Sequence, residues 1–340
     1  MEVVGVLRAL LLLAVTSLAT VVPRQEALSY PQNPQNDYSC RSAIHPNPVV
    51  MIHGLLSTYY TDINLLEAYL KSQGFCTFSF TYGVPFGITL VGGVRSIADS
   101  SREVADFILQ VARLTGNPNI DLVSHSEGGF QALYVPKFYP QVAAVVRNVV
   151  AIGPPTHGTT VSGLYLLAYL GGHLTRDLVG DVFQTLGCGA CDDLGGKGDG
   201  QDGPAVRALN QGPIAVPGIR YTIMISKQDE IVTPPETAFV NEPGVRNFFI
   251  QDYCPQEVVG HLGEPNSPNV HEIVVNTLSG SLAGPRICSA GPSLQLGGGW
   301  PSLPPIEQLE STLSNLVGTS GLPLKKREIE IELYSNTIVA

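Results

Sequence analysis

A serine between a predicted strand and a predicted helix is the first residue whose surroundings indicate chemistry. Ser126 lies in SHSEGG, residues 124–129, after the apolar residues 120–123, which predict a strand, and before a helix predicted from Phe130. A nucleophile elbow needs this context, because its sharp turn lifts a serine hydroxyl to the carboxyl end of a sheet. Gly128 is the small residue expected after the serine, but Ser124 replaces the glycine expected before it. The alternative interpretation is a polar turn in which Ser126 caps the helix.

An acidic partner for this serine should follow a later strand. Residues 221–225 predict a strand that leads into SKQDEIVTP, residues 226–234, where Asp229 is the expected acid. Glu230 is the competing carboxylate, and Asp192 and Asp193 in a glycine-rich segment are more distant candidates. We favour Asp229 because a short side chain on a strand-end loop is well placed to orient a histidine.

The base follows the acid in folds that carry such an elbow, which leaves His261 and His271 as candidates. His261 lies in VGHLG, residues 259–263, a flexible loop that allows its ring to reach inward, whereas His271 falls in the closing helix and is expected on the surface. We expect His125 on the opposite side of the elbow in a packing role, and His157 in the wall of the pocket. A Ser126–His261–Asp229 triad would transfer acyl groups from esters.

An oxyanion hole is predicted after the first core strand. The apolar residues 48–52 end in His53-Gly54, the place where an oxyanion loop belongs. The two donors would be the backbone N–H groups of Leu55 and Glu127, which act when negative charge develops on the carbonyl oxygen. The alternative for His53-Gly54 is a simple turn that ends the strand.

Strands alternate with helices along most of the chain. This order predicts an α/β fold in which helices flank a mostly parallel central sheet. Strands are expected at residues 48–52, 76–82, 120–123, 148–152, 221–225 and 247–250, and helices at residues 63–71, 96–114 and 269–278.

The pattern divides the 340 residues into four parts. Residues 1–19 resemble a signal peptide, with Arg8 before an apolar run and small residues at a cleavage site, and a signal anchor is the alternative. Residues 20–39 predict an N-terminal arm or propeptide, and residues 40–288 a catalytic domain with a cap insertion at about 155–215. Residues 289–340 predict a linker and tail, in which Lys326-Arg327 is either a processing site or a solvated charge cluster.

Composition limits the partners of the chain. Hydrophobic residues make up 44% of the sequence, which is enough for a large core, and the net charge is −10. An acidic chain lacks the basic surface that nucleic acid or anionic lipid would need, whereas neutral esters and glycerides remain compatible. No segment after the N-terminal one is apolar and long enough to cross a bilayer.

Six cysteines are consistent with a secreted chain whose cysteines form disulfides. Closeness in sequence suggests a Cys188–Cys191 bridge and leaves the other pairings open. A zinc site at this CxxC is disfavoured, because no second ligand pair follows.

Five motifs together resemble the family of secreted bacterial and fungal lipases that includes Candida antarctica lipase B. They are PVVMIHG (48–54), DLVSHSEGG (121–129), GTTVSG (158–163), DEIVTP (229–234) and GHLG (260–263). Their order and spacing agree over about residues 38–288. The resemblance implies an α/β-hydrolase fold with a small cap, hydrolysis of triacylglycerols or other carboxylic esters, and no cofactor. It also implies disulfides Cys40–Cys76 and Cys254–Cys288, with Cys188–Cys191 as an additional short bridge.

Three positions depart from the family pattern. Ser124 replaces glycine or threonine, and Glu127 replaces glutamine after the nucleophile, where an unpaired carboxylate would oppose the oxyanion. Leu55 replaces a hydroxyl residue and removes a side-chain donor. These changes bear on the turnover rate more than on the reaction class.

Three functional hypotheses follow. The first is a secreted, monomeric serine esterase or lipase that acts on lipid or other ester substrates. The second is a hydrolase or acyltransferase for an ester or lactone of a particular metabolite. The third is an inactive hydrolase fold that serves as a binding protein, because a fold does not guarantee a function.

Overall fold

Short apolar segments form the strands at the centre of the fold. The computed structural model describes residues 36–84, 92–159, 188–196 and 202–289, which all fall in one unit, Gln32–Gly297. Within these residues a six-stranded sheet has the order β2-β1-β3-β4-β5-β6, and all neighbouring strands are parallel. The predicted α/β fold is therefore confirmed. The strands are β1 (Val49–Ile52), β2 (Thr77–Ser79), β3 (Ile120–His125), β4 (Val146–Ile152), β5 (Arg220–Ile225) and β6 (Val245–Phe249).

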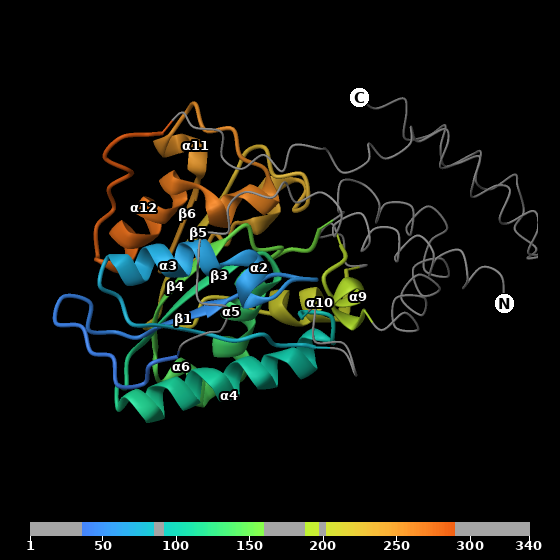
Figure 1. Cartoon of the computed structure of the whole chain (residues 1–340). Helices are drawn as coiled ribbons and strands as arrows, with labels where there is room; N and C mark the ends of the chain where they lie inside the picture. Colours follow the sequence, from blue (N-terminus) through green and yellow to red (C-terminus); the bar gives the residue numbers. More distant parts are fainter. Residues whose placement is uncertain (1–35, 85–91, 160–187, 197–201, 290–340) are drawn as a thin grey trace, which may run out of the picture. The chain divides into compact units, whose positions relative to one another are not determined.

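Helices cover both faces of this sheet (Figure 1). The alternation of side chains along β1 sends Val50 and Ile52 into one apolar cluster and Val49 and Met51 into another. The first cluster includes residues of α4 (Ile97–Thr115), α5 (Glu127–Phe138) and α6 (Pro140–Ala143), and the second includes residues of α3 (Asn64–Ser72) and α12 (Pro268–Leu278). Because both faces of β1 are covered, the strand is entirely apolar rather than alternating with polar residues.

Clear start and stop signals define α4, which was predicted over residues 96–114. Ser96 accepts a hydrogen bond from the backbone N–H of Asp99 at the N-terminus of the helix. Gly116 ends the helix in the left-handed conformation, with φ of 65°. Between them, buried Val104, Ile108 and Val111 recur at helical spacing.

The strand order brings the candidate site residues to one edge of the sheet. The chain passes from β1 outward to β2 and then returns to the other side of β1 as β3, so the strand order reverses between β1 and β3. Ligands of open α/β sheets bind beyond the carboxyl ends of the strands at such a point. The residues His53-Gly54 follow β1, and Ser126 follows β3.

Most elements lie within two residues of the expected ranges, but two differ by more. Strand β2 is shorter than residues 76–82, and α5 begins at Glu127 rather than at Phe130 because the elbow leads directly into the helix. The remaining short elements are α2 (Tyr59–Asp62), α9 (Gly189–Asp193), α10 (Pro204–Asn210), η1 (Pro235–Ala238), α11 (Ile250–Tyr253) and η2 (His261–Asn266).

The predicted cap insertion is described only in part. Helices α9 and α10 belong to it, and a bridge joins Thr159 to Gly195. The leucine-rich residues 164–174 lie outside the described residues, as do the predicted signal peptide, most of the N-terminal arm, nearly all of the C-terminal tail and the dibasic site. Among the described helices, none combines the length and the apolar character required to cross a membrane.

Three disulfides join the six cysteines. The Cα–Cα distances are 5.8 Å for Cys40–Cys76, 5.4 Å for Cys188–Cys191 and 5.4 Å for Cys254–Cys288. These are the pairs expected from closeness in sequence and from the family resemblance. The first bridge ties the segment before β1 to the start of the β2 region, and the last ties the end of α11 to the chain beyond α12.

Helix α5 approaches β1 so closely that only glycine fits at position 128. A Cβ at Gly128 would lie 2.5 Å from the carbonyl oxygen of His53 and would also collide with that of Ile52. Both obstacles are backbone atoms, which cannot move aside as the end of a side chain could. The close packing that the elbow requires therefore depends on this residue.

We predict that Gly128→Ala lowers the free energy of unfolding by about 3 kcal/mol or more, because the added methyl overpacks the interior against fixed backbone. Gly116→Ala is the matched control, since its Cβ would meet nothing within 4 Å and only the positive φ opposes it. That control should cost about 1 kcal/mol. Urea denaturation followed by circular dichroism measures both values, and equal losses in the two variants would contradict the proposed collision.

Candidate active site

The backbone of Ser126 adopts a strained conformation between β3 and α5. Its φ is 54° and its ψ is −124°, and Leu56 is the other non-glycine residue with positive φ in the described part of the chain. Residues held in sparsely populated regions cost about 1–3 kcal/mol each and concentrate at functional sites. A hydrogen bond from the Ser126 N–H to the carbonyl oxygen of Ile152, 2.8 Å long, fixes the turn against β4. The predicted nucleophile elbow is present as a local structure.

Ser124 fits the elbow despite its departure from the family pattern. The residue is fully buried, and its hydroxyl donates a hydrogen bond to the carbonyl oxygen of Val150 on β4 at 3.1 Å. A buried hydroxyl with a partner carries little cost, whereas an unpaired one would be expensive. The strand therefore accommodates serine at this position.

Ser126, His261 and Asp229 form one hydrogen-bonded chain. The Nε2 atom of His261 lies 2.8 Å from the Ser126 hydroxyl oxygen, and its Nδ1 atom lies 2.6 Å from a carboxylate oxygen of Asp229. The second carboxylate oxygen of Asp229 accepts the backbone N–H groups of Ile231 and Val232, each at 2.8 Å. These bonds hold the carboxylate in place, so that it can orient the imidazole. The three residues predicted from the sequence are therefore brought together.

The environment of His261 favours its protonated form. Burial acts to lower its pKa, but the charge of Asp229 and the hydrogen bond to it raise the pKa above the usual 6.5. More distant carboxylates, Asp62 and Glu230, act in the same direction. A raised pKa makes the ring a stronger proton acceptor, which suits a general base.

The competing carboxylates lie at other positions. Glu230 accepts the backbone N–H of His261 at 3.0 Å and so contacts the main chain rather than the ring. Asp193 accepts the backbone N–H of Ile97 at 2.7 Å, at the start of α4. Asp192 is buried on α9. Of the four candidates, Asp229 is the one hydrogen-bonded to the ring of His261.

Two histidine predictions are wrong. His125 is not on the side of the elbow away from the candidate base, since its ring packs against that of His261 with centroids 4.7 Å apart. His271 is buried rather than on the surface, because it lies on the face of α12 that packs inward, 5.2 Å from the Tyr69 ring of α3. Its Nε2 atom forms a 2.8 Å hydrogen bond with the carbonyl oxygen of Pro265.

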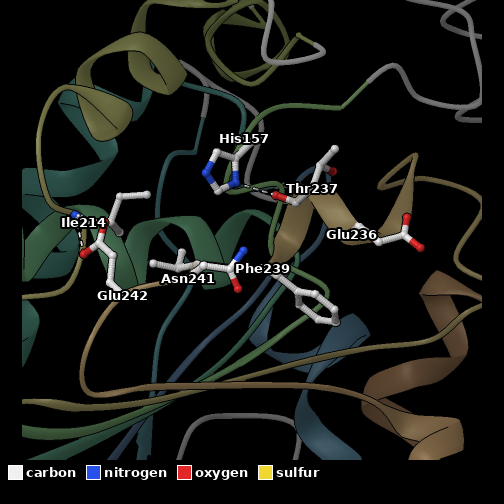
Figure 2. Close-up of a pocket in the computed structure, with 8 residues that line it drawn as sticks. His157, Ile214, Glu236, Thr237, Phe239, Asn241 and Glu242 are labelled. Carbon is white, nitrogen blue, oxygen red and sulfur yellow. Dashed lines mark hydrogen bonds between the residues drawn. The ribbon is translucent and has the colours of Figure 1, made fainter.

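His157 lines a cavity, but the lining contains no member of the Ser126–His261–Asp229 chain. Figure 2 shows the ring of His157 hydrogen-bonded to the carbonyl oxygen of Thr237, at 2.8 Å. The cavity has a volume of about 500 Å³ and is open on one side. Its other lining residues are Ile214, Glu236, Phe239, Val240, Asn241 and Glu242. The prediction that His157 lines the pocket of the candidate site therefore finds no support in this cavity.

The loop after β1 comes very close to the candidate nucleophile. A Cβ at Gly54 would lie 2.9 Å from the Cβ of Ser126, so glycine is needed for this approach. Leu55 follows directly, and Glu127 is the first residue of α5, where backbone N–H groups have no partner within the helix. The predicted donors, Leu55 and Glu127, therefore belong to segments that flank Ser126.

The carboxyl group of Glu127 is fully buried beside the Tyr82 hydroxyl and the Gln131 amide. Neither of its oxygens has a hydrogen-bond partner among the described residues. Burial raises the pKa of Glu127 well above the usual value. The neighbouring Tyr82 and Gln131 lower this pKa, but by less than burial raises it. The group is therefore uncharged over a pH range in which an exposed glutamate is ionised, and it places no negative charge beside the expected oxyanion.

Glu264 is a residue at the site that sequence reasoning missed. One carboxyl oxygen accepts the Ser226 N–H at 2.6 Å, and the other has no partner among the described residues. A Cβ at Gly153 would lie 2.5 Å from that second oxygen and 3.3 Å from both Asp229 Oδ2 and His261 Cε1. Burial and the neighbouring Asp229 raise the pKa of Glu264 well above its usual value. Nothing in the local sequence distinguishes this glutamate from a surface residue.

One group of side chains has the composition of a metal site. Ligand atoms of His125, His261 and Glu264 all lie within 4.8 Å of one another. Both nitrogens of each histidine already form hydrogen bonds within the protein. A metal ion would have to break these bonds, so the arrangement fits the hydrogen-bonded chain better than a metal centre.

Comparisons with known proteins relate part of this chain to lipases. Residues 46–160, which include Ser126, match the model of the family described as lipase, class 2. A crystal structure of Aspergillus fumigatus lipase B matches with 21% identity and a TM-score of 0.54. That match covers 74% of this chain and 55% of the lipase chain, so this chain spans about half the length of that lipase.

Two further structures match with lower scores. The mature form of Bacillus licheniformis lipase BlEst2 has 14% identity and a TM-score of 0.47, with 72% of this chain and 96% of that chain covered. Carboxylesterase CesB from Bacillus subtilis has 16% identity and a TM-score of 0.42, with 71% and 87% covered. Together, the family match and the Aspergillus structure confirm the resemblance to lipase-type α/β-hydrolases.

We predict that Glu127→Gln stabilises the protein relative to the wild type increasingly as pH rises. The folded state raises the pKa of Glu127, so the folded protein retains a proton that the unfolded chain releases near pH 4.5. Wild-type stability therefore falls with pH above about 4.5, whereas glutamine has no such dependence. Below that pH the difference between the two proteins should be constant.

Urea denaturation at half-unit steps from pH 4 to pH 9 measures this difference. Glu236→Gln, which removes an exposed carboxylate, is the control and should show no comparable trend. A constant difference between wild type and Glu127→Gln over the whole range would mean that Glu127 is ionised in the folded protein.

Proposed function

We propose that the protein is a secreted serine hydrolase that cleaves carboxylic esters, with lipids as the favoured substrate class. The observation that carries this proposal is the hydrogen-bonded chain Ser126–His261–Asp229 at the end of β3, with bonds of 2.8 and 2.6 Å. The strained turn at Ser126 and the family match over residues 46–160 support it. A hydrolase fold kept only for binding would have no need to retain this arrangement.

The proposed reaction begins when the Ser126 oxygen attacks the ester carbonyl carbon. His261 Nε2 accepts the hydroxyl proton, while Asp229 holds the ring in the required tautomer and stabilises its charge. The carbonyl oxygen becomes an oxyanion and accepts hydrogen bonds from the backbone N–H groups of Leu55 and Glu127. His261 then protonates the leaving alcohol as the C–O bond breaks, which gives an acyl ester of Ser126. Water attacks this ester by the same sequence and releases the acid.

The substrate class and the location are inferred from composition and covalent structure. Exposed apolar side chains lie on the segments that flank Ser126 and His261, namely Leu56 and Leu262. An acidic chain with such residues suits neutral esters better than anionic ones. Three disulfides are compatible with an oxidising compartment and thus with the predicted signal peptide at residues 1–19.

We predict that Ser126→Ala lowers kcat for p-nitrophenyl butyrate by at least about 1,000-fold and abolishes labelling by a fluorophosphonate probe, because no nucleophile remains. Ser101→Ala is the matched control, since Ser101 is also buried and hydrogen-bonded but lies on α4. Labelled peptides from the wild type should contain residue 126 and no other modified serine. Activity of Ser126→Ala equal to that of the wild type would reject the proposal.

We predict that kcat/KM falls as pH decreases, with a midpoint above pH 6.5. Only neutral His261 can accept the serine proton, and its neighbours raise the pKa of the ring above 6.5. Asp229→Asn should move the midpoint to lower pH and reduce kcat/KM by about 10,000-fold, as in other serine hydrolases. A pH–rate profile from pH 5 to 9 with an uncharged ester measures the midpoint. A profile that stays flat down to pH 5 would remove His261 from the role of base.

A further inference from the structure

The histidine before the nucleophile is buried between two hydrogen-bond acceptors. The Nδ1 atom of His125 lies 2.8 Å from an Asp62 carboxylate oxygen, and its Nε2 atom lies 3.1 Å from the carbonyl oxygen of His261. A carbonyl and a carboxylate can only accept, so each ring nitrogen must carry a proton to form its bond. Neutral imidazole has one N–H, whereas this arrangement requires two.

His53 provides a contrast within the same fold. Its Nδ1 atom lies 2.8 Å from the carbonyl oxygen of Gly54, which accepts, and its Nε2 atom accepts the Tyr82 N–H at 3.3 Å. One donor and one acceptor match the neutral ring, and burial lowers the pKa of His53 to about 4. His53 and His125 thus have partners of different kinds, and of these two rings only His125 requires a second proton.

The partner of His125 is a carboxylate. Burial acts to raise the pKa of Asp62, but the charge of His125 and hydrogen bonds from His125 and Gly54 lower it below the usual value. Both residues are almost completely inaccessible, with 8% exposure for Asp62 and 2% for His125. A buried charge persists when an opposite charge and hydrogen bonds compensate for the lost water, and each residue supplies these to the other.

We infer that His125 is an imidazolium ion paired with Asp62, and that this ion pair positions the oxyanion loop and the base relative to each other. The second oxygen of Asp62 accepts the Gly54 N–H at 2.6 Å, directly before the proposed donor Leu55. On the other side of the pair, His125 Nε2 donates a hydrogen bond to the main-chain carbonyl oxygen of His261. The positioning role rests on the proposed function, whereas the charge of His125 does not.

The connection spans four separate segments of the chain. Gly54 follows β1, Asp62 ends α2, His125 ends β3, and His261 begins η2. Removal of the pair would free the loop and the base to move independently, although both must be aligned with the tetrahedral transition state. Since such misalignment affects the transition state more than substrate binding, it should lower kcat rather than raise KM.

The charges around the pair are consistent with a cationic ring. Asp229, hydrogen-bonded to the neighbouring His261, and Glu230, bonded to the His261 N–H, face this region from the loop after β5. Glu264 faces it from η2, and burial raises the pKa of that carboxyl, which favours its uncharged form. His53 is neutral. The ring of His261 packs against that of His125 with centroids 4.7 Å apart, and it is neutral when it acts as the base. The charge of Asp62 therefore serves both rings, because it pairs with His125 and also raises the pKa of His261.

Nuclear magnetic resonance of full-length protein with ¹⁵N-labelled histidine tests the charge directly. At pH 7.5 both ring nitrogens of His125 should show a one-bond coupling to a proton, while His53 should show one such coupling. Each histidine signal is assigned by its disappearance from the spectrum of His125→Gln or His53→Gln. If one of these variants does not fold, the signal is assigned from through-space contacts in the wild-type protein. A ring nitrogen of His125 without a proton at pH 7.5 would overturn the inference, whatever the activity.

Kinetics of Asp62→Asn test the positioning role. We predict at least about a tenfold loss of kcat for p-nitrophenyl butyrate with KM changed less than about twofold, together with loss of one His125 ring proton. Glu67→Gln is the matched control, because Glu67 is buried on the adjacent α3 and accepts bonds from Thr77 and Ser79, away from the triad. Wild-type kcat in a folded Asp62→Asn protein would overturn the positioning role. If Ser126→Ala retained activity, the proposed function would be rejected. The nuclear magnetic resonance experiment would then still decide whether His125 is charged.

Discussion

The turn at Ser126 is a backbone constraint on which the surrounding structure depends. A residue with φ of 54° and ψ of −124° persists only where its neighbours leave no alternative. Here the Ser126 N–H is hydrogen-bonded to β4, and α5 begins at the next residue. Gly54 and Gly128 have no side chains, so the segment after β1 can pack directly against Ser126 and α5. The parallel sheet supplies these neighbours, because β1 and β4 flank β3 on its two sides.

Around this turn the protein buries several carboxyl groups, and two solutions to their desolvation occur. Asp229 and Asp62 each have a histidine partner together with backbone N–H donors, which compensate a charge. Glu127 and Glu264 have unpaired oxygens and raised pKa values, and so avoid the charge instead. Among these four carboxyl groups, the two that contact a histidine are the ones whose charge is compensated.

The sequence was sufficient for features that depend on local pattern or on strand-end position. The strands, α4, and the meeting of Ser126, Asp229 and His261 follow from apolar runs and from what comes after each strand. Asp62, Glu264 and the burial of His271 could not be found in this way, because their surroundings are created by packing between distant segments. Asp62 ends a four-residue helix and meets a histidine 63 residues away, a contact that no local spacing encodes.

The departures from the lipase pattern fall where the proposed chemistry does not require a particular side chain. In the proposed reaction a backbone N–H acts as the oxyanion donor whatever side chain follows it, so Leu55 removes at most an additional hydroxyl. The same proposal uses only the N–H of Glu127, and burial of its carboxyl raises its pKa and so favours the uncharged form. Ser124 needs only to be small and to satisfy its hydroxyl, which Val150 does. The positions that must supply a nucleophile, a base and an acid carry residues that can do so, and this is why the changed motif remains compatible with ester hydrolysis.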